Sequence, residues 1–354
     1  MIELSVSFFG VFFATFVLTP ITNRLGLVDT PDHRKVHDGN IPLVGGIAMF
    51  ATTALAALFF VPSSSEMAFL LAACALLTMT GSIDDRYDLH YKLRLGVQAL
   101  SACLLIWGAN TSLQSFGNVL GFGDLQLGLF STPITIIAVI GMINAFNMID
   151  GIDGLSGGLS LITVTALYFL IGDQIADGAS NILLLLIGAL SAYLVMNLHV
   201  FPKWTPKIFM GDAGSMVLGF IITAFLIRYS QGSKQIMMPV TALWLVAVPL
   251  LDIFVTCIRR VKHKKNPFHA DRTHVHHIFM RAGFTTRTTL IAILGFQVLA
   301  AGIGVWLQVI WQNGIISFIA FVALFLAYLQ FIKHSFKAAK WLRKNVTNSN
   351  PHSK

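Results

Sequence analysis

The chain has 354 residues, of which 55% are hydrophobic and only 11% are charged, and its formal net charge is +8. Soluble proteins are roughly 45–50% apolar and about 25% charged, so these proportions exclude a soluble globular enzyme and a disordered protein. In a membrane protein an excess of lysine and arginine reflects topology more often than nucleic-acid binding, and we expect no nucleic-acid partner.

Charge-free apolar runs recur along the whole chain, each approaching the roughly 20 residues that cross a bilayer as a helix. We therefore predict an all-α, polytopic integral membrane protein with about eleven membrane-spanning helices. Residues 1–332 would form the transmembrane domain and residues 333–354 a basic cytoplasmic tail. In chain order the predicted spans cover residues 6–21, 43–61, 67–83, 95–107, 127–148, 155–171, 182–198, 213–227, 236–251, 290–309 and 315–332.

The positive charges fall almost entirely on one side of these spans. Every lysine and arginine except Arg228 and Lys234 lies there, together with all 11 histidines. The positive-inside rule makes that side cytoplasmic, with the N-terminus periplasmic and the C-terminus cytoplasmic in a bacterial inner membrane. Its longest polar stretch is the loop 259–287, and its basic tail is suited to anionic membrane lipids.

An acidic cluster, Asp84, Asp85 and Asp88, directly follows the third predicted span. Adjacent carboxylates repel each other unless a cation or a proton lies between them. Such a cluster could be merely a solvated loop. The cations just beyond it, Lys92 and Arg94, favour a site for metal-bridged phosphates instead.

Two further polar motifs, NAFNMIDGIDG (144–154) and FMGDAGS (209–215), lie at the ends of apolar spans. Helical spacing puts Asn147 and Asp150 on one face, while Asp153 lies in a glycine-flanked turn. Asp212 could simply cap the eighth span, but carboxylates and amides at the ends of apolar helices are costly without a function. Asn147 and Asp212 supply hard oxygen ligands, which suit Mg²⁺, with Mn²⁺ as a substitute, better than zinc.

The basic loop 259–287 carries the segment Asp271-Arg272-Thr-His274-Val-His276-His277. Three histidines could form a zinc site. No cysteine is near, however, and the surrounding cations favour binding of a pyrophosphate or a sugar. Lys35 adds a basic group on the same side. We interpret Asp252 as an acid at the membrane edge that pairs with a neighbour, and do not assign it to the site.

In this order, and each at a predicted cytoplasmic helix end, these motifs resemble those of the polyprenyl-phosphate N-acetylhexosamine-1-phosphate transferases. The similarity runs from about residue 26 to residue 284. The related muramoyl-pentapeptide transferases are similar in the acidic motifs, but their uninterrupted histidine triple is broken here by Val275.

The resemblance implies the reaction of UDP-N-acetylglucosamine with undecaprenyl phosphate, which gives GlcNAc-pyrophosphoryl-undecaprenol and UMP. This would be the first lipid-linked step in cell-surface polysaccharide synthesis of the O-antigen or enterobacterial common antigen type. Another UDP-N-acetylhexosamine as donor remains an alternative, and so does a different class of protein, an anion or nucleotide-sugar transporter. The sequence does not set the oligomeric state, and a homodimer stays open.

The resemblance also implies roles for individual residues. Asn147 and Asp212 would hold Mg²⁺ on the nucleotide pyrophosphate, Asp153 would contact the uridine end, and Asp150 would organise the site. Lys92 or Arg94 would hold a phosphate, while Arg272, His274, His276 and His277 would meet the pyrophosphate or the sugar. Asp84 and Asp85 would orient or deprotonate the lipid phosphate. We favour direct attack on the β-phosphorus, with a covalent phosphosugar–aspartate intermediate through Asp84, Asp85 or Asp150 as the alternative.

Overall fold

The computed structural model describes residues 1–30, 39–172, 174, 177–262, 264 and 274–348, with side chains described to residue 334. Within these residues the chain is almost entirely helical, and its one sheet is a two-stranded antiparallel pair. The elements are α1 (Ile2–Arg24), β1 (Val28–Asp29), β2 (Ile41–Pro42), α2 (Gly45–Phe60), α3 (Ser65–Tyr87), α4 (Tyr91–Cys103), η1 (Leu104–Gly108), η2 (Gly128–Phe130), α5 (Ser131–Ile149), α6 (Leu155–Ile171), α7 (Ala179–Asn197), α8 (Gly211–Arg228), η3 (Gly232–Lys234), α9 (Pro239–Leu245), α10 (Ala247–Lys262), α11 (Val275–Arg281), α12 (Thr286–Trp306), η4 (Leu307–Trp311) and α13 (Gly314–Asn348).

The helical, membrane-spanning architecture expected from the sequence is confirmed. In the described part of the chain seven helices are long and apolar enough to cross a bilayer, and a bent pair of helices would make an eighth. The apolar helices α2 and α6 are shorter, with 16 and 17 residues. The predicted number of eleven spans therefore stays a prediction.

The ninth predicted span, residues 236–251, is not one continuous helix. The chain breaks at Val246, and α9 and α10 meet at an angle of 87°. Gln297 of α12 satisfies the backbone groups that the break leaves unpaired: its Oε1 accepts the Val248 N–H (2.9 Å) and its Nε2 donates to the Leu245 carbonyl (2.7 Å). A buried amide side chain thus satisfies backbone groups at the break, which would be costly to leave unpaired in an apolar environment.

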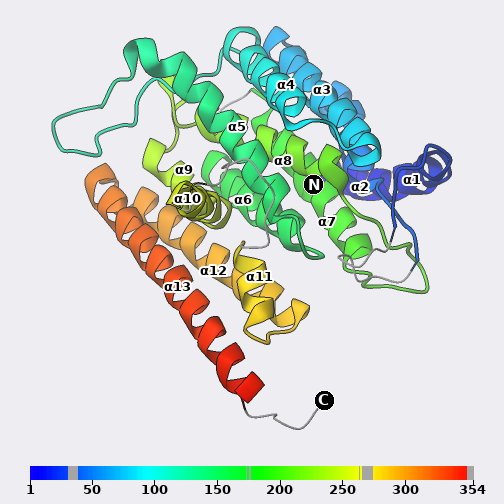
Figure 1. The fold of residues 1–354 in the computed structure, drawn as a ribbon. Helices are drawn as coiled ribbons and strands as arrows, with labels where there is room; N and C mark the ends of the chain where they lie inside the picture. Colours follow the sequence, from blue (N-terminus) through cyan, green and yellow to red (C-terminus); the bar gives the residue numbers. More distant parts are fainter. Residues whose placement is uncertain (31–38, 173, 175–176, 263, 265–273, 349–354) are drawn as a thin grey trace.

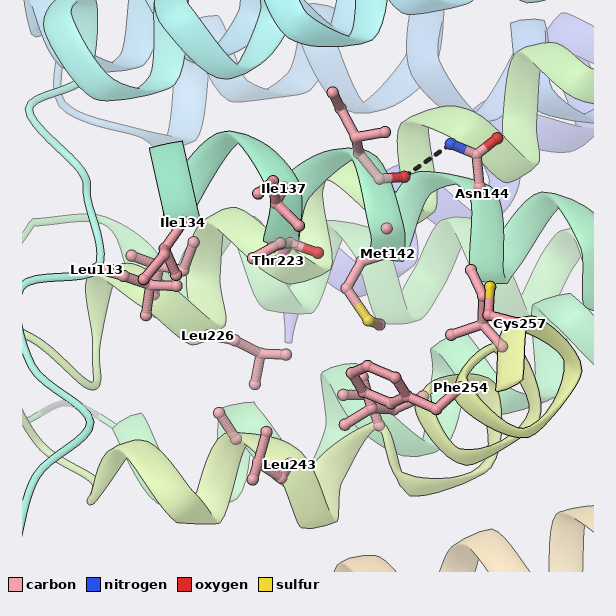
Figure 2. Close-up of a pocket in the computed structure, with 18 of the residues that line it drawn as sticks. Leu113, Ile134, Ile137, Met142, Asn144, Thr223, Leu226, Leu243, Phe254 and Cys257 are labelled. Carbon is pink, nitrogen blue, oxygen red and sulfur yellow. Dashed lines mark hydrogen bonds between the residues drawn. The ribbon is translucent and has the colours of Figure 1, made fainter. Parts of the chain in front are cut away.

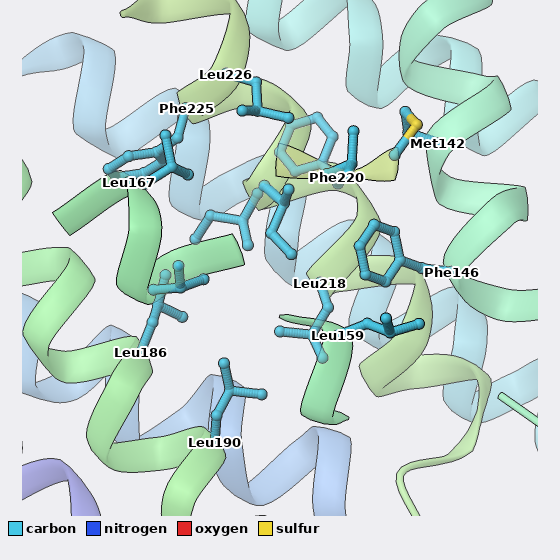
Figure 3. Packing of buried hydrophobic residues seen from close by; sticks show 14 of the residues in the cluster. Met142, Phe146, Leu159, Leu167, Leu186, Leu190, Leu218, Phe220, Phe225 and Leu226 are labelled. Carbon is cyan, nitrogen blue, oxygen red and sulfur yellow. The ribbon is translucent and has the colours of Figure 1, made fainter. Parts of the chain in front are cut away.

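Helix α8 lies at the centre of the bundle. It packs against α3 and α5, and it also contacts α2 and α6. All its residues from Ala213 to Ile227 are buried. Figure 1 shows α5 to α8 in the middle of the molecule, with α1 to α4 on one side and α9 to α13 on the other. In Figure 3 the ring of Phe146 (α5) lies by Leu159 (α6) and Leu218 (α8), while the ring of Phe220 (α8) lies nearer Met142 (α5) and Leu226 (α8). The central packing therefore fixes the ends of α5 and α8 relative to each other.

The two basic residues that break the positive-inside pattern are paired with acids. Lys234 Nζ lies 3.3 Å from both Glu66 and Asp177, while Arg228 pairs with Glu66 and lies 3.6 Å from Asp177. Two positive and two negative charges therefore cancel at this end of the bundle. This pairing explains how Arg228 and Lys234 can lie on the side that the charge count leaves otherwise nearly free of cations.

Candidate active site

The acidic motifs meet at the ends of three helices. Asp84 and Asp85 lie in the last turns of α3, Asn147 in the last turn of α5, and Asp212 in the first turn of α8. A Cβ on Gly81 would overlap the Cα of Ala213, so α3 and α8 touch backbone to backbone just beside these residues. The structure thus brings together side chains that are up to 128 positions apart in the sequence.

Asp84 and Asp85 both hold parts of the site in place. Asp84 is buried; its Oδ2 pairs with Arg94 Nη1 at 2.6 Å and its Oδ1 accepts the Leu89 N–H at 2.7 Å. Asp85 accepts the backbone N–H of Asp212 on both carboxylate oxygens. The same Arg94 nitrogen lies 3.6 Å from Asp212 Oδ2, so one guanidinium lies beside two of the motifs.

Asn147 and Asp212, the two residues predicted to bind the metal, are direct neighbours. Asn147 Nδ2 donates to Asp212 Oδ1 at 2.7 Å and to Ser215 Oγ at 3.0 Å. No group of three or more His, Cys, Asp and Glu side chains suited to a metal ion occurs in the described residues. One carboxylate and one amide therefore match a cation that keeps waters or binds substrate phosphates, as Mg²⁺ does, rather than a closed protein cage.

Asp150 and Asp153 differ in their surroundings. Asp150 is only partly accessible and ends α5; burial, with the charges of Asp85 and Asp153 adding to it, raises the pKa of its carboxyl to about 7. Asp153 is more open and pairs with Lys207 Nζ at 2.6 Å. Lys207 in turn lies over the ring of Phe209, 5.4 Å from its centroid. The site thus has a largely desolvated carboxyl near a half-buried ion pair.

The histidine segment meets the acidic motifs at Gly151. A Cβ on that glycine would overlap His276 Nε2. His276 is buried, and neither ring nitrogen has a hydrogen-bond partner within the described residues. Burial, followed by the charge of His277, lowers the pKa of His276 to about 3, so its imidazole is neutral at physiological pH.

One cavity of about 1190 Å³ joins these groups to an apolar groove. Arg94, Asn147, Asp212 and the three histidines line one part of it, and apolar residues of α5, α8, α9, α10 and the segment 113–125 line most of the rest. Figure 2 shows Ile137, Met142, Leu226, Leu243 and Phe254 around the shared space, with Asn144 donating to the Ile140 carbonyl. From Ile134 to Met148 the groove follows α5 for about 21 Å, at 1.5 Å per residue.

Not every predicted site residue can be placed. Lys35 and Arg272 lie outside the described residues. Lys92 is exposed on the first turn of α4, and within the described chain only its backbone N–H is engaged, by His90 Nδ1. Of the two cations predicted to hold a phosphate, Arg94 is the one that reaches the acidic cluster.

Three residues at the site were not assigned to it from the sequence. Lys207 pairs with Asp153, and Asn197 links the DGIDG turn to the segment before α8, through the Gly154 N–H and the Ile208 carbonyl. Asp252 binds the histidine segment. Lys207 is two residues from the FMGDAGS motif, and Asn197 and Asp252 each interrupt an apolar stretch; both are usable signals, although neither identifies the partner.

A helical membrane protein with a charged site at the head of an apolar groove can accommodate an apolar chain beside a charged soluble molecule. Comparison with known proteins agrees. Residues 67–230 match the model of glycosyl transferase family 4. The chain is also 39% identical over 97% of its length to the undecaprenyl-phosphate alpha-N-acetylglucosaminyl 1-phosphate transferase of Haemophilus influenzae, of which it covers 97%.

Other relatives carry the same name. The transferase of Pasteurella multocida is 39% identical, with 97% of this chain and 96% of the relative covered, and that of Escherichia coli K12 is 34% identical, with 93% and 90% covered. The chain therefore belongs to this family of membrane-bound glycosyl transferases and is an enzyme. The relatives give no support to a transporter.

Proposed function

We propose that the enzyme transfers GlcNAc-1-phosphate from UDP-GlcNAc to undecaprenyl phosphate, and that its site faces the cytoplasm. The observation that carries this proposal is the single cavity that joins Arg94, Asn147 and Asp212 to an apolar groove. A groove wall of about 21 Å covers most of the roughly 30 Å of a bilayer core, which suits a polyprenyl chain. The relatives' shared name supports the choice of both substrates.

The polar end of the cavity would receive the donor pyrophosphate and the lipid phosphate. Asn147 and Asp212 would hold Mg²⁺, or Mn²⁺ in its place, on the donor pyrophosphate. The metal, when bound, supplies positive charge where negative charge develops during transfer. Arg94 lies next to both Asp84 and Asp212 and would hold an incoming phosphate. Lys92, exposed on the first turn of α4, would add positive charge at the approach to the site, and Lys35 is proposed as a further basic group for substrate binding.

We propose direct attack by the lipid phosphate. An oxygen of the lipid phosphate forms a bond to the β-phosphorus of the donor, the bond from that phosphorus to the bridging oxygen breaks, and UMP leaves with the electron pair. A phosphate monoester has a second pKa near 6, so it needs little help to lose its proton. The carboxylates of Asp84 and Asp85 already accept hydrogen bonds on both oxygens, which favours orienting roles over nucleophilic ones.

The donor would extend from the metal toward Asp153 and the histidines. Asp153, paired with Lys207 at the more open edge of the site, would contact the uridine end, and Asp150 would organise the glycine-rich turn. His274, His276 and His277 line the cavity and would meet the pyrophosphate or the sugar, a role that the family resemblance also gives to Arg272. The neutral, unpartnered imidazole of His276 is suited to a hydrogen bond with a bound ligand.

The test is turnover by the purified protein. UDP-GlcNAc, undecaprenyl phosphate and Mg²⁺ should together give UMP and a lipid-linked GlcNAc pyrophosphate in equal amounts, and other UDP-N-acetylhexosamines should react more slowly. Without lipid, labelled UMP should not exchange into UDP-GlcNAc. Lipid-free exchange would establish the covalent route, and absence of UMP with every donor would refute the proposed function.

A further inference from the structure

Asp252 is a buried carboxylate that joins three helices. It lies on α10 and is 4% exposed. Its Oδ2 accepts from His274 Nδ1 at 2.6 Å, and its Oδ1 accepts the Val275 N–H at 2.9 Å and the Tyr328 hydroxyl at 3.2 Å. Asp252 therefore ties α10 to the start of α11 and to α13. No motif or spacing in the sequence places it near the histidines.

The two oxygens of this carboxylate have different partners. Oδ1 binds groups that belong to the scaffold: the first amide of α11, whose N-cap residue His274 makes no side-chain cap, and a tyrosine of the last helix. Oδ2 binds only the imidazole of His274 within the described residues. The scaffold contact and the histidine contact can therefore be separated by mutation.

The contact with His274 determines which of its nitrogens is available. Because a carboxylate only accepts hydrogen bonds, Nδ1 of His274 carries the proton in this pair, and Nε2 remains for other partners. His274 lines the same cavity as Arg94 and Asp212. A carboxylate that fixes the orientation and the protonated nitrogen of a histidine is a common way to hold a functional imidazole ready.

We infer that Asp252 is a positioning residue for the transfer reaction. It holds His274 with Nδ1 turned to the carboxylate, so that Nε2 is presented as a hydrogen-bond acceptor to a hydroxyl or amide N–H of the sugar nucleotide bound in the cavity. This inference rests on the proposed function, since it requires that the cavity binds the sugar nucleotide. Asp252 itself does not line the cavity and acts through His274.

The decisive variant is Asp252→Asn. Asparagine can still accept from Val275 and Tyr328 through its oxygen, but it offers an N–H to His274, which then must carry its own proton on Nε2. We expect kcat to fall about 10- to 100-fold, the range typical for losing a carboxylate that orients a functional histidine. Tyr328→Phe is the matched control, because it removes a partner of the same carboxylate without touching His274. We expect it to keep kcat within about threefold.

A double-mutant cycle with His274→Gln separates positioning from a structural role. His274→Gln alone should lower kcat about as much as Asp252→Asn, and the double variant should be no more than about threefold worse than His274→Gln. The inference would be overturned if the kcat losses of the two single variants multiplied in the double variant, or if Tyr328→Phe were as slow as Asp252→Asn. If Asp252→Asn gives no cooperative thermal transition, the same cycle is run with Asp252→Glu. Failure of the proposed function would be seen earlier, as a wild-type protein that releases no UMP.

Discussion

The backbone N–H of Asp212 donates to both carboxylate oxygens of Asp85, at 2.9 and 3.0 Å, across 127 positions of sequence. The N-terminal end of a helix attracts negative charge because its first amides lack partners within the helix. The carboxylate of Asp85 occupies this end of α8, and it thereby fixes the turn that carries the Asp212 side chain. Two acidic motifs thus form one unit although they belong to different helices.

Replacing the proposed metal ligand should abolish most of the activity. Asp212→Asn removes a charge from the position where charge is redistributed during transfer. We expect kcat to fall by about 10²–10³, or about 2.7–4 kcal/mol in the barrier. The matched control is Asp124→Asn, the same chemical change at an exposed position far along the chain, which should leave kcat unchanged. Steady-state UMP release measures both, and an Asp212→Asn enzyme with wild-type kcat would exclude the assigned role.

The activity should depend on a divalent metal that is bound by oxygen ligands and not by the histidines. Activity should disappear in EDTA and return with Mg²⁺ or Mn²⁺, because Asn147 and Asp212 offer hard oxygen donors. Restoration by zinc alone, lost on replacing His274, His276 and His277, would show that the histidines bind the metal.

The close approach of α3 and α8 makes Gly81 sensitive to a single methyl group. In Gly81→Ala the new Cβ would overlap the Ala213 backbone, which cannot move aside as a flexible side chain could. We expect a loss of about 1–3 kcal/mol in stability, as for other overpacked sites, and a lower kcat because Asp84 and Asp85 would move away from Asp212. Gly302→Ala, at an exposed glycine of α12 with open space around it, is the control. Equal melting temperatures for the two variants in detergent would contradict the packing described above.

Asp150 should make stability depend on pH. Its pKa of about 7 in the folded protein exceeds the ordinary value of 3.8, so the folded state keeps a proton that the unfolded state loses between these values. Wild-type stability should therefore fall as pH rises from about 4 to 7, and the penalty is complete above pH 7. Without metal, Asp150→Asn should be more stable than the wild type at pH 8, by up to about 4 kcal/mol, with no difference near pH 4. A difference independent of pH would show that Asp150 does not titrate as described.

The charge distribution predicts which ends of the bundle face the cytoplasm. In a cysteine-free background, Ser63→Cys should react with an impermeant thiol reagent in intact cells, and Lys203→Cys should react only after the membrane is opened. Both positions are exposed in the structure. The reverse labelling pattern would place the site away from the cytoplasm and refute the proposed orientation.

The motifs indicated which residues meet, because short polar stretches stand out against an apolar chain. Asn147 and Asp212 are 65 positions apart, yet each interrupts an apolar run where no charge or amide is needed for solubility. The bend at Val246 could not be predicted in this way. The run around it is almost entirely apolar, and the backbone groups at the bend are bound by side chains from elsewhere in the chain, Gln297 of α12 and Thr163 of α6.

The contacts that support the site could not be predicted from the sequence either. Asp252 and His274 are 22 positions apart and Asp153 and Lys207 are 54 apart, and neither spacing matches a helical or strand repeat. Hydropathy and motif spacing describe segments one at a time. Which carboxylate meets which base depends on how the segments pack, which is a property of the folded chain.

The first turn of α8 is held between α2 and α3 by contacts in which the facing positions are Gly46, Gly81, Ala213 and Gly214. None of these residues has a rotatable side chain, so this turn is fixed in place without any loss of rotamer freedom at the contact. A larger side chain would need to settle into one of several conformers, and thermal exchange among them would shift Asp212. Backbone-to-backbone packing removes that source of disorder, so the spread of Asp212 positions should widen little on warming, until the helices themselves separate.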